Sequence, residues 1–536
     1  MLKKRQILPL LIIAFFVLTM IAPLIKMLSH IATVDVIAII TSKRFINALI
    51  NSLLVSTAST VISVVLAIVL AWLISQSNIK FKNFFIMVFT LPMLIPSISH
   101  GIGIIVLYGQ NGVITNILGL KTSVYGFIGI TLGSVMYSYP VAFIMVYDIF
   151  GYEDKAPYAA ADVLGIPQSK QFFSITIPYL RKPLIAVIFA VFTMVITDYG
   201  VPTMVGGLRT TLSMMMYQDV IGQIDFGKGS VIGLILLIPA IVTFLVDMLN
   251  KDKGNTAYVF SNFDRHKSKL KDLLAYIFCV AISIMVLLPI ITFSALTFIA
   301  KYPVNMRVTF HNIAHTFNMN AGRFLANSII VAIIASIFGV AISFATAYFT
   351  ARMRSKFSRI LHLVSIASLA IPGLVLGLSY AMFFSGSFIY GTVMILIIVN
   401  LVHFFASPYL MLYNTMCKTN ENLEAVGATL GIPRIRIILA VILPQSKDTI
   451  IEMVAYFFVN SIITISAVAF LFNTQNKPIS LMITNFEGNR LIECAAFVSV
   501  LILVVNLCIK ILAIALKGRK MKLVDNKKAI RDIDVL

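Results

Sequence analysis

The sequence is poor in charged residues: Asp, Glu, Lys and Arg make up 12% of its 536 residues, whereas about a quarter of the residues of a soluble domain are charged. Hydrophobic residues make up 59%. Apolar runs of about 20 residues recur from end to end, the length that a helix needs to cross a hydrocarbon core ~30 Å thick. The composition excludes a soluble domain and predicts a protein that crosses the membrane many times.

Acidic residues are the scarcer charged class, with 21 Asp and Glu against 42 Lys and Arg. When the predicted loops are assigned alternately to two sides, most basic residues fall on one side, together with both termini. The positive-inside rule makes that side the cytoplasm. No basic patch carries interleaved aromatic residues, so we expect the lipid bilayer, and no nucleic acid, as a partner of this chain.

Cysteine is also rare, and the four cysteines show neither a CxxC pair nor metal-ligand spacing. We therefore predict no disulfide and no metal site. His311 and His315 share a helix face, but no acidic residue stands at the usual spacing. We interpret them as the polar face of a short interfacial helix.

Open sheets are excluded in lipid because their unpaired backbone groups cost several kcal/mol each, so the spans are helices. The first follows Lys3, Lys4 and Arg5, but its apolar run is too long for a signal peptide and no small-residue cleavage site follows, so we expect a retained helix. The predicted fold class is an all-α integral membrane protein of about 12 transmembrane helices. They lie near 7–27, 48–74, 84–107, 127–149, 184–206, 229–249, 273–297, 324–350, 360–384, 389–413, 449–472 and 491–516.

The chain is predicted to be a tandem duplication of two six-helix halves. Asn51-Ser-Leu-Leu-Val is echoed by Asn327-Ser-Ile-Ile-Val, and Leu91-Pro-Met-Leu-Ile-Pro by Ala370-Ile-Pro-Gly-Leu-Val. Since each half has six helices, both enter the membrane in the same direction, as parallel repeats with a path at their interface. The predicted parts are a first half (1–249), a cytoplasmic linker (250–272), a second half (273–516) and a basic cytoplasmic tail (517–536).

A short polar segment occurs once in each half, between hydrophobic spans. The first copy reads Ala159-Ala-Ala-Asp-Val-Leu-Gly-Ile-Pro and the second Ala425-Val-Gly-Ala-Thr-Leu-Gly-Ile-Pro. Thirteen positions separate the glycine from a later proline in both copies. Two copies at matched positions favour a structured element over a simple connector.

The residue types predict a helix, a break and a second helix in each copy. The glycines can adopt the left-handed conformation that ends a helix. Pro167 and Pro433 stand where a new helix can start, because a first-turn N–H has no intrahelical partner anyway. The later prolines are expected to close the second short helix and to open the next span. We interpret loops 150–183 and 416–448 as stiff, bent hairpins in the cytoplasm.

Both segments resemble the "EAA" signature of binding-protein-dependent ABC transporter permeases: Glu-Ala-Ala, three residues, Gly, then Leu/Ile-Pro thirteen positions on. The resemblance covers nearly the whole chain, since each half has the family's six-span layout. It implies that each segment is a coupling helix that seats in a groove of an ATP-binding subunit. The implied docking residues are Ala159, Ala160, Ala161, Gly165, Pro167, Pro178, Glu424, Ala425, Gly431, Pro433 and Pro444.

Both copies depart from the signature at its acidic residue. Ala159 and Ala425 stand in its place, and Glu424 lies one position earlier in the second copy. The second copy also has Val426 and Gly427 where the signature has alanines. The contact that fixes the ATP-binding subunit is therefore expected to differ from the family's acidic contact.

The resemblance implies a multi-pass protein of the cell (inner) membrane with two kinds of partner, two ATP-binding cassette subunits on the cytoplasmic side and an extracytoplasmic substrate-binding protein. The chain has no GxxxxGK(S/T) phosphate loop. We therefore expect no cofactor in it, ATP and Mg²⁺ in a separate ATPase, and a transport subunit rather than an enzyme.

An ion-coupled secondary transporter is the alternative of a different class. Such carriers usually keep ionisable residues deep in their helices, and here Asp198 and Glu452 are the main exceptions to an uncharged pattern. No segment resembles a selectivity filter, which disfavours a channel.

Within the family, the chain resembles the fused permeases of the ferric iron, 2-aminoethylphosphonate, thiamine and polyamine branch. Val205-Gly-Gly followed by Gln223-Ile-Asp-Phe-Gly is closest to the aminoethylphosphonate members. The solute predicted from this resemblance is 2-aminoethylphosphonate, with ferric iron, thiamine or a polyamine as alternatives.

Candidate path-lining residues lie at matched positions of the fifth and eleventh spans. Thr197 and Asp198 correspond to Thr464 and Ser466, and we expect them to line the translocation path near its outer mouth. The alternative for Asp198 is a helix-end residue that contacts the outer loop. His100 is a further path candidate, the alternative being a contact with backbone carbonyls between helices.

Overall fold

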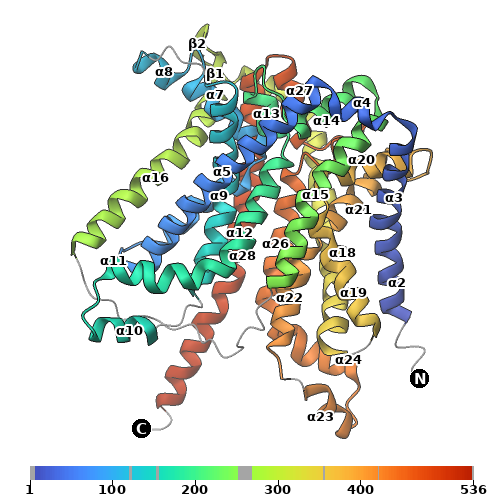
Figure 1. The fold of residues 1–536 in the computed structure, drawn as a ribbon. Helices are drawn as coiled ribbons and strands as arrows, with labels where there is room; N and C mark the ends of the chain where they lie inside the picture. The colour runs from blue at the N-terminus through green and yellow to red at the C-terminus, as the bar shows by residue number, and fades with distance from the viewer. Residues whose placement is uncertain are drawn as a thin grey trace. The chain divides into compact units, whose positions relative to one another are not determined.

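The computed structural model describes residues 7–119, 124–151, 156–250, 269–353, 356–420 and 422–533 (Figure 1). Most of them lie in helices, and the described strands β1 (Ile299–Lys301) and β2 (Asn305–Val308) form one antiparallel hairpin. The predicted all-α membrane class is confirmed. Residues 251–268 of the predicted linker lie outside the described residues.

Eight helical stretches in the described part of the chain are long and apolar enough to cross a membrane, and three bent helix pairs raise the number to eleven. The eight are Ile7–Thr33, Lys43–Gln76, Phe127–Gly151, Phe172–Ile196, Phe226–Val246, Asp272–Leu296, Ala321–Arg352 and Ile492–Lys517. They cover eight of the twelve predicted spans, although the fifth is shifted toward the N-terminus. The third, ninth, tenth and eleventh spans differ from the prediction.

The third and ninth spans are sharply bent at matched prolines. The arms of the third, α6 (Lys82–Thr90) with η3 (Leu91–Leu94) and α7 (Ser97–Tyr108), meet at 103°. The arms of the ninth, α19 (Lys356–Ala367) with η5 (Ser368–Ala370) and α20 (Gly373–Phe384), meet at 106°.

The cause of both bends is the residue before the proline, because a following proline disfavours the helical conformation there. Ile95 and Ile371, which precede Pro96 and Pro372, are extended in backbone conformation. Each of these two predicted spans is therefore a pair of arms and not one continuous helix. The tenth span bends by 48° between α21 (Val393–His403) and α22 (Ala406–Cys417).

The fifth and eleventh spans end earlier than predicted. α12 (Ile177–Ile196) ends ten residues before the predicted 206, and α26 (Lys447–Ile463) ends nine before 472. The 17 residues of α26 extend ~26 Å at 1.5 Å per residue, which is shorter than the ~30 Å hydrocarbon core. Thr197, Asp198 and Thr464 therefore lie just beyond helix ends.

The chain folds into two compact units that do not follow its order. The first unit comprises Leu28–Asn320 and Ser480–Val500, and the second comprises Ala321–Ile479, the residues up to Met27 and those from Leu501 on. Helix α2 (Ile7–Phe16) thus packs against α19 of the second half. The buried ring of Phe16 lies 4.6 Å from that of Phe405, between centroids.

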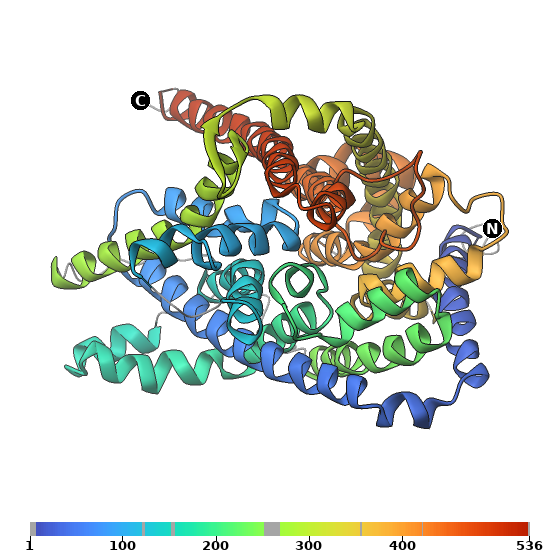
Figure 2. The same cartoon turned by 90° about the horizontal axis from the view of Figure 1, so that it is seen from above.

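In the first unit, α5 (Lys43–Gln76) and α9 (Phe127–Gly151) lie side by side (Figures 1 and 2). Small polar residues form the seam, where the hydroxyls of Ser63 and Ser138 are 2.9 Å apart, since small side chains let helix backbones approach in a membrane. Other helices of this unit are α4 (Val36–Thr41), α8 (Val113–Ile117), α13 (Gly200–Val205), α14 (Leu212–Gln223), α15 (Phe226–Asn250), α16 (Lys269–Leu296), α17 (His311–Asn318) and α27 (Ser480–Gly488).

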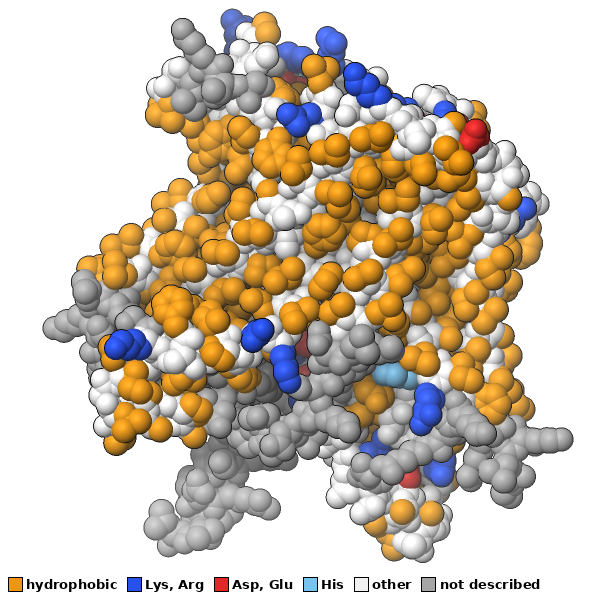
Figure 3. All heavy atoms as spheres, in the orientation of Figure 1, with side chains coloured by type: hydrophobic (Ala, Val, Ile, Leu, Met, Phe, Trp, Pro, Cys, Tyr) orange, Lys and Arg blue, Asp and Glu red, His pale blue; other side chains and the backbone are white. Residues whose placement is uncertain are grey.

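In the second unit, α18 (Ala321–Arg352) is packed against α26 at a glycine. A Cβ atom at Gly339 would stand 2.6 Å from the ring of Phe457, so only glycine allows this approach. α28 (Ile492–Ile533) begins in the first unit and continues in the second, through most of the predicted tail. Many large apolar side chains of the described residues are exposed, and they make much of the surface drawn in Figure 3 hydrophobic.

Candidate functional site

The first polar segment folds into a bent pair of short helices, the first elbow, made of α10 (Ala156–Val163) and α11 (Gln168–Gln171). Gly165 has φ +68°. The N–H of Gly165 donates to the carbonyl of Asp162 at 3.1 Å, and that of Ile166 to Ala161 at 2.9 Å. This pair of bonds is a Schellman motif, which satisfies the last carbonyls of a helix.

The second polar segment repeats this geometry in the second elbow, made of α23 (Leu423–Thr429) and α24 (Arg434–Ile437). Gly431 has φ +69°, and the N–H of Ile432 donates to the carbonyl of Gly427 at 2.8 Å. Apart from the neighbouring residues in the chain, no described atom would lie within 4 Å of a Cβ at Gly165 or Gly431. Glycine is therefore required by the backbone conformation and not by crowding, as the sequence predicted.

The prolines act at the predicted helix start but not at the predicted helix end. The carbonyl of Pro167 accepts from Gln171 at 3.1 Å, and that of Pro433 from Arg436 at 2.9 Å, so each begins the second helix. Pro178 and Pro444 do not close it.

The chain instead continues from each elbow into the next span through a π turn. These turns are η4 (Phe172–Thr176), which leads directly into α12, and η6 (Ile438–Ile442), followed by the short α25 (Leu443–Gln445) and α26. A proline crowds the carbonyl four residues earlier and has no N–H to donate to it. The wider turn before Pro178 and Pro444 accommodates that defect, so no break stands at either proline, and each proline lies in the first turn of the next helix, as predicted. In the second unit a short break follows at Ser446, between α25 and α26.

Buried side-chain contacts brace the first elbow. The amide of Gln171 donates to the Asp162 carboxylate and to the carbonyl of Ile166, both at 2.8 Å. The hydroxyls of Tyr158 and Thr176 are 2.6 Å apart. These contacts hold the two arms of the bend at a fixed angle.

An ion pair braces the second elbow. Arg352, at the end of α18, donates to both oxygens of Glu424 at 2.8 and 2.5 Å. It also donates to the carbonyls of Thr419 at 2.8 Å and Asn420 at 2.7 Å. The side chains are 4% and 13% exposed, so Glu424, the acid one position early, is engaged within this chain.

The charge state of Glu424 follows from this pair. Burial by itself raises the pKa of Glu424, but the hydrogen bonds and the charge of Arg352 outweigh it and hold the pKa below its ordinary value. Glu424 is therefore ionised at neutral pH, and Arg352 at the C-terminal end of α18 also interacts favourably with the helix dipole.

The elbows expose apolar side chains at their tips. Val163 and Leu164 in the first elbow are 87% and 75% exposed, and Leu430 in the second is 68% exposed. Of the predicted docking residues, Ala161 and Glu424 face inward, while the exposed ones are Ala159, Ala160, Gly165, Pro167, Pro178, Ala425, Gly431, Pro433 and Pro444. Exposed apolar residues on a rigid frame are typical of a protein-docking surface.

Asp198, a predicted path residue, joins three elements of the first unit. Its carboxylate accepts from the Ser97 hydroxyl at 2.6 Å and from the backbone N–H of Val201 at 3.0 Å. The hydroxyl of Ser213 donates to its carbonyl at 2.6 Å. The Asp198 carboxylate thus accepts the first N–H groups of α13 and joins the bent third span and α14 to it. The Thr197 hydroxyl donates to carbonyls of its own helix turn, those of Thr193 and Met194.

The matched residues of the second unit also lie against a bent span. A Cβ at Gly373, which starts the second arm of the ninth span, would stand 2.5 Å from the Ser466 hydroxyl and 2.9 Å from Nε2 of His403. Thr464 is buried beyond the end of α26. The sequence analysis did not identify His403 as a candidate. It lies at the end of α21, where the tenth span bends, and the sequence around it gives no other indication of a role.

His100 lies buried on α7 of the first unit, with its ring 6.3 Å from that of Tyr137 between centroids. Asp198, Thr197 and His100 are therefore in one unit and Thr464 and Ser466 in the other. Their role as a translocation path stays a prediction.

The repeated Asn-Ser pairs of α5 and α18 make matching hydrogen bonds to a later segment of their own unit. Asn51 donates to the carbonyl of Thr210 at 3.1 Å, and Asn327 to that of Gln475 at 2.9 Å. The next serine accepts a loop N–H in each unit, at 2.7 Å for Ser52 and 2.8 Å for Ser328. The sequence echo thus reflects one loop anchor used twice.

Comparison with known proteins finds one family twice along the chain. The family described as "Binding-protein-dependent transport system inner membrane component" matches residues 63–252 and again 339–522. The chain is 24% identical over 434 residues to the ferric transport system permease protein FbpB of Actinobacillus pleuropneumoniae, covering 77% of this chain and 63% of that protein.

Further relatives are also transport system permeases by name. A putative ferric transport system permease protein, FbpB 1, of Haemophilus influenzae is 23% identical over 423 residues, 75% of this chain and 67% of that protein. The thiamine transport system permease protein ThiP of Brucella abortus is 27% identical over 169 residues, 30% of this chain and 31% of that protein. The chain thus spans about two thirds of the length of the ferric relatives. With two family matches in one polypeptide, this chain belongs to the binding-protein-dependent transport system inner membrane components, as a fused, double-domain ABC permease.

Proposed function

We propose that this chain is the membrane subunit of an ATP-driven importer that receives a small polar solute from an extracytoplasmic binding protein. The observation that carries the proposal is the pair of braced elbows, which have the same backbone geometry at matched positions of the two family domains. We place both elbows and both termini in the cytoplasm, in line with the excess of basic residues predicted on that side.

Each elbow would seat in one ATP-binding cassette subunit, so that one copy of the chain binds two such subunits. The docking contact would rest on the apolar tips Val163, Leu164 and Leu430, since the signature acid is absent and Glu424 is paired with Arg352. ATP-driven closure of the cassettes would then move the elbows.

Stiffness is what lets an elbow transmit such movement. Arg352 ties the second elbow to the end of α18, whose 32 residues extend ~48 Å. Near the other end of this helix, Asn327 holds the 473–479 loop. A displacement of the elbow would therefore reach that loop through one continuous helix within the second unit.

For the solute, we propose ferric iron first, because the two relatives that cover most of this chain are ferric transport permeases by name. The sequence stretches at 205–207 and 223–227 favour 2-aminoethylphosphonate as the second candidate. Purified chain reconstituted with its ATPase and binding protein should take up one of these solutes when ATP is supplied and no ion gradient exists. Uptake that requires the gradient and ignores ATP would instead support a secondary transporter.

Docking is tested with glycine variants that have a matched control. Gly165→Val and Gly431→Val force a β-branched residue into the left-handed region, which costs roughly 1–2 kcal/mol and distorts the bend. Gly386→Val imposes the same strain at φ +79°, also with no atom within 4 Å of its Cβ, but far from the elbows in sequence. We expect loss of ATPase co-purification for the elbow variants alone. Full retention in both would contradict the docking role.

A further inference from the structure

A small cavity lies in the second unit, where α18, α21 and α26 meet the loop that follows α26. The space open to the centre of a water molecule is about 10 Å³, which corresponds to one such molecule. The residues that line it are Asn327, Ser328, Val331, Leu396, Asn400, Ser461, Val468, Asn476 and Pro478. The cavity is therefore too small for a transported solute and has room for one water.

Three buried polar atoms of the lining residues have no hydrogen-bond partner among the described residues. They are Oδ1 of Asn400, Oγ of Ser461 and Nδ2 of Asn476. The three residues are 1%, 5% and 4% exposed, so bulk water does not reach them. An unpaired polar group in an apolar interior is costly, most of all in a membrane protein. Three such atoms at one cavity therefore indicate a shared partner.

The other hydrogen bonds of the two asparagines fix which atom of each is left. Nδ2 of Asn400 donates to the carbonyl of Leu396 at 2.7 Å, so its oxygen, an acceptor, remains. Oδ1 of Asn476 accepts from the backbone N–H of Asn473 at 2.6 Å, so its nitrogen, a donor, remains. The hydroxyl of Ser461 can do either. The shared partner must therefore donate to one atom and accept from another.

This combination excludes an ion. A cation is bound by acceptors, whereas Nδ2 of Asn476 only donates, and an anion is bound by donors, whereas Oδ1 of Asn400 only accepts. No charged side chain lines the cavity among the described residues. A water molecule both donates and accepts, and a buried water typically makes about three hydrogen bonds to polar groups of this kind.

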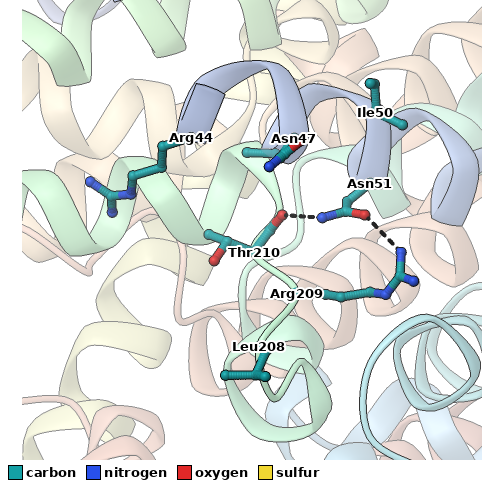
Figure 4. A pocket seen from close by; sticks show the side chains of 8 residues that line it. Arg44, Asn47, Ile50, Asn51, Leu208, Arg209 and Thr210 are labelled. Carbon is teal, nitrogen blue, oxygen red and sulfur yellow. Dashed lines mark hydrogen bonds between the residues drawn. The ribbon is translucent and has the colours of Figure 1, made fainter. Parts of the chain in front are cut away.

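The matched loop of the first unit is held by groups of the chain itself. Asn51 donates to the carbonyl of Thr210 at 3.1 Å and accepts from Nη1 of Arg209 at 3.2 Å (Figure 4). None of the described residues that line the pocket in Figure 4 leaves a buried polar atom unpaired. The loop of the second unit carries Lys477, but its Nζ lies over the ring of Phe472, 5.3 Å from the centroid. Of these two loop anchors, as far as they are described, the second thus leaves polar atoms for a further partner.

We propose that one structural water binds in this cavity. It accepts from Nδ2 of Asn476, donates to Oδ1 of Asn400 and makes its third hydrogen bond with Oγ of Ser461. Asn327 and Ser328 already hold the backbone of the same loop to α18. The water ties the loop to α21 and α26 as well, and this role does not depend on the importer function.

The test is the direction of a change in amide hydrogen exchange, measured on the full chain in lipid nanodiscs. Ser461→Ala removes one hydrogen bond of the water, so exchange at the bonded N–H groups of Asn476 and Ile479 should become about two- to tenfold faster. Without the water, the same change removes an unpaired buried hydroxyl and slows exchange instead. Ser343→Ala is the control. The hydroxyl of Ser343, on α18, is also buried and unpaired among the described residues, but Ser343 does not line the cavity.

Faster exchange in the loop for Ser461→Ala, with no change for Ser343→Ala, supports the water site. Unchanged or slower exchange for Ser461→Ala overturns it, and so does equal acceleration in both variants. A density map of the unaltered chain that resolves other interior waters gives a second, independent readout. It should show one peak about 2.7–3.2 Å from each of the three atoms, and a map without that peak overturns the proposal. Neither measurement involves ATP, an ATPase or a solute, so failure here leaves the importer function untouched.

Discussion

Breaking the Arg352–Glu424 pair should loosen the second elbow and leave the first unchanged. Removing one partner of a buried ion pair typically costs ~3–5 kcal/mol. In Glu424→Gln the amide retains one acceptor, and the carbonyls of Thr419 and Asn420 still hold Arg352. We therefore expect a smaller loss, about 2 kcal/mol of local stability, since charged hydrogen bonds contribute ~1.5–3 kcal/mol each.

Amide hydrogen exchange in nanodiscs measures this loss where it occurs. A decrease of about 2 kcal/mol in the free energy of local opening speeds exchange roughly 30-fold. We expect this in α23 for Glu424→Gln, with α10 of the first elbow unchanged as the internal reference. Asp448→Asn, at an exposed acid near the start of α26, is the control variant. Unchanged exchange in α23, or equal changes in α10 and α23, would refute the reasoning.

The same pair predicts a pH dependence. The pKa of Glu424 is lowered from its ordinary value of 4.5, because Arg352 outweighs the effect of burial. A lowered pKa in the folded state means that the pair stabilises the elbow above pH 4.5, and that this stability is lost as the pH falls through the lowered pKa. Protection of α23 should therefore decline below pH 4.5 in the unaltered chain, and the Glu424→Gln variant should lack this step.

Three further variants probe other contacts. Gly427→Ala should destabilise the second elbow by ~1–3 kcal/mol, because the alanine Cβ would stand 2.2 Å from Cδ1 of Ile437. We expect faster amide exchange in α23, and the added substitution Ile437→Ala should partly reverse it. Gln171→Met should speed exchange in α10 and spare α23, since two hydrogen bonds that brace the first elbow are lost; an effect in both elbows would contradict it. Ser97→Ala should lower the melting temperature of the chain, because it removes a hydrogen bond to Asp198 that contributes ~1.5–3 kcal/mol. An unchanged melting temperature would show that Asp198 needs no hydrogen-bond donor from the bent third span.

Local sequence predicted the elbows because their geometry is a local property. A helix that ends in a left-handed residue requires glycine within one turn of the break, and both Gly165 and Gly431 have that conformation. The π turns before Pro178 and Pro444 were missed, since a proline near a helix start is compatible with a break and with a continuous, wider turn. The bends at Pro96 and Pro372 were missed because a hydrophobic run indicates how long a membrane segment is, but not whether its helix axis changes direction.

The sequence alone determined the membrane class, the duplication and the position of the two elbows, because composition, periodicity and turn chemistry act over a few residues. Tertiary structure decided the contacts between residues far apart in the sequence, which such local patterns do not predict. It paired Arg352 with Glu424 across 72 residues, joined Ser97 to Asp198 across 101 residues, and joined the first helix to the second half of the chain. These contacts depend on which helix faces meet when the chain packs, and spacing along the sequence does not specify that.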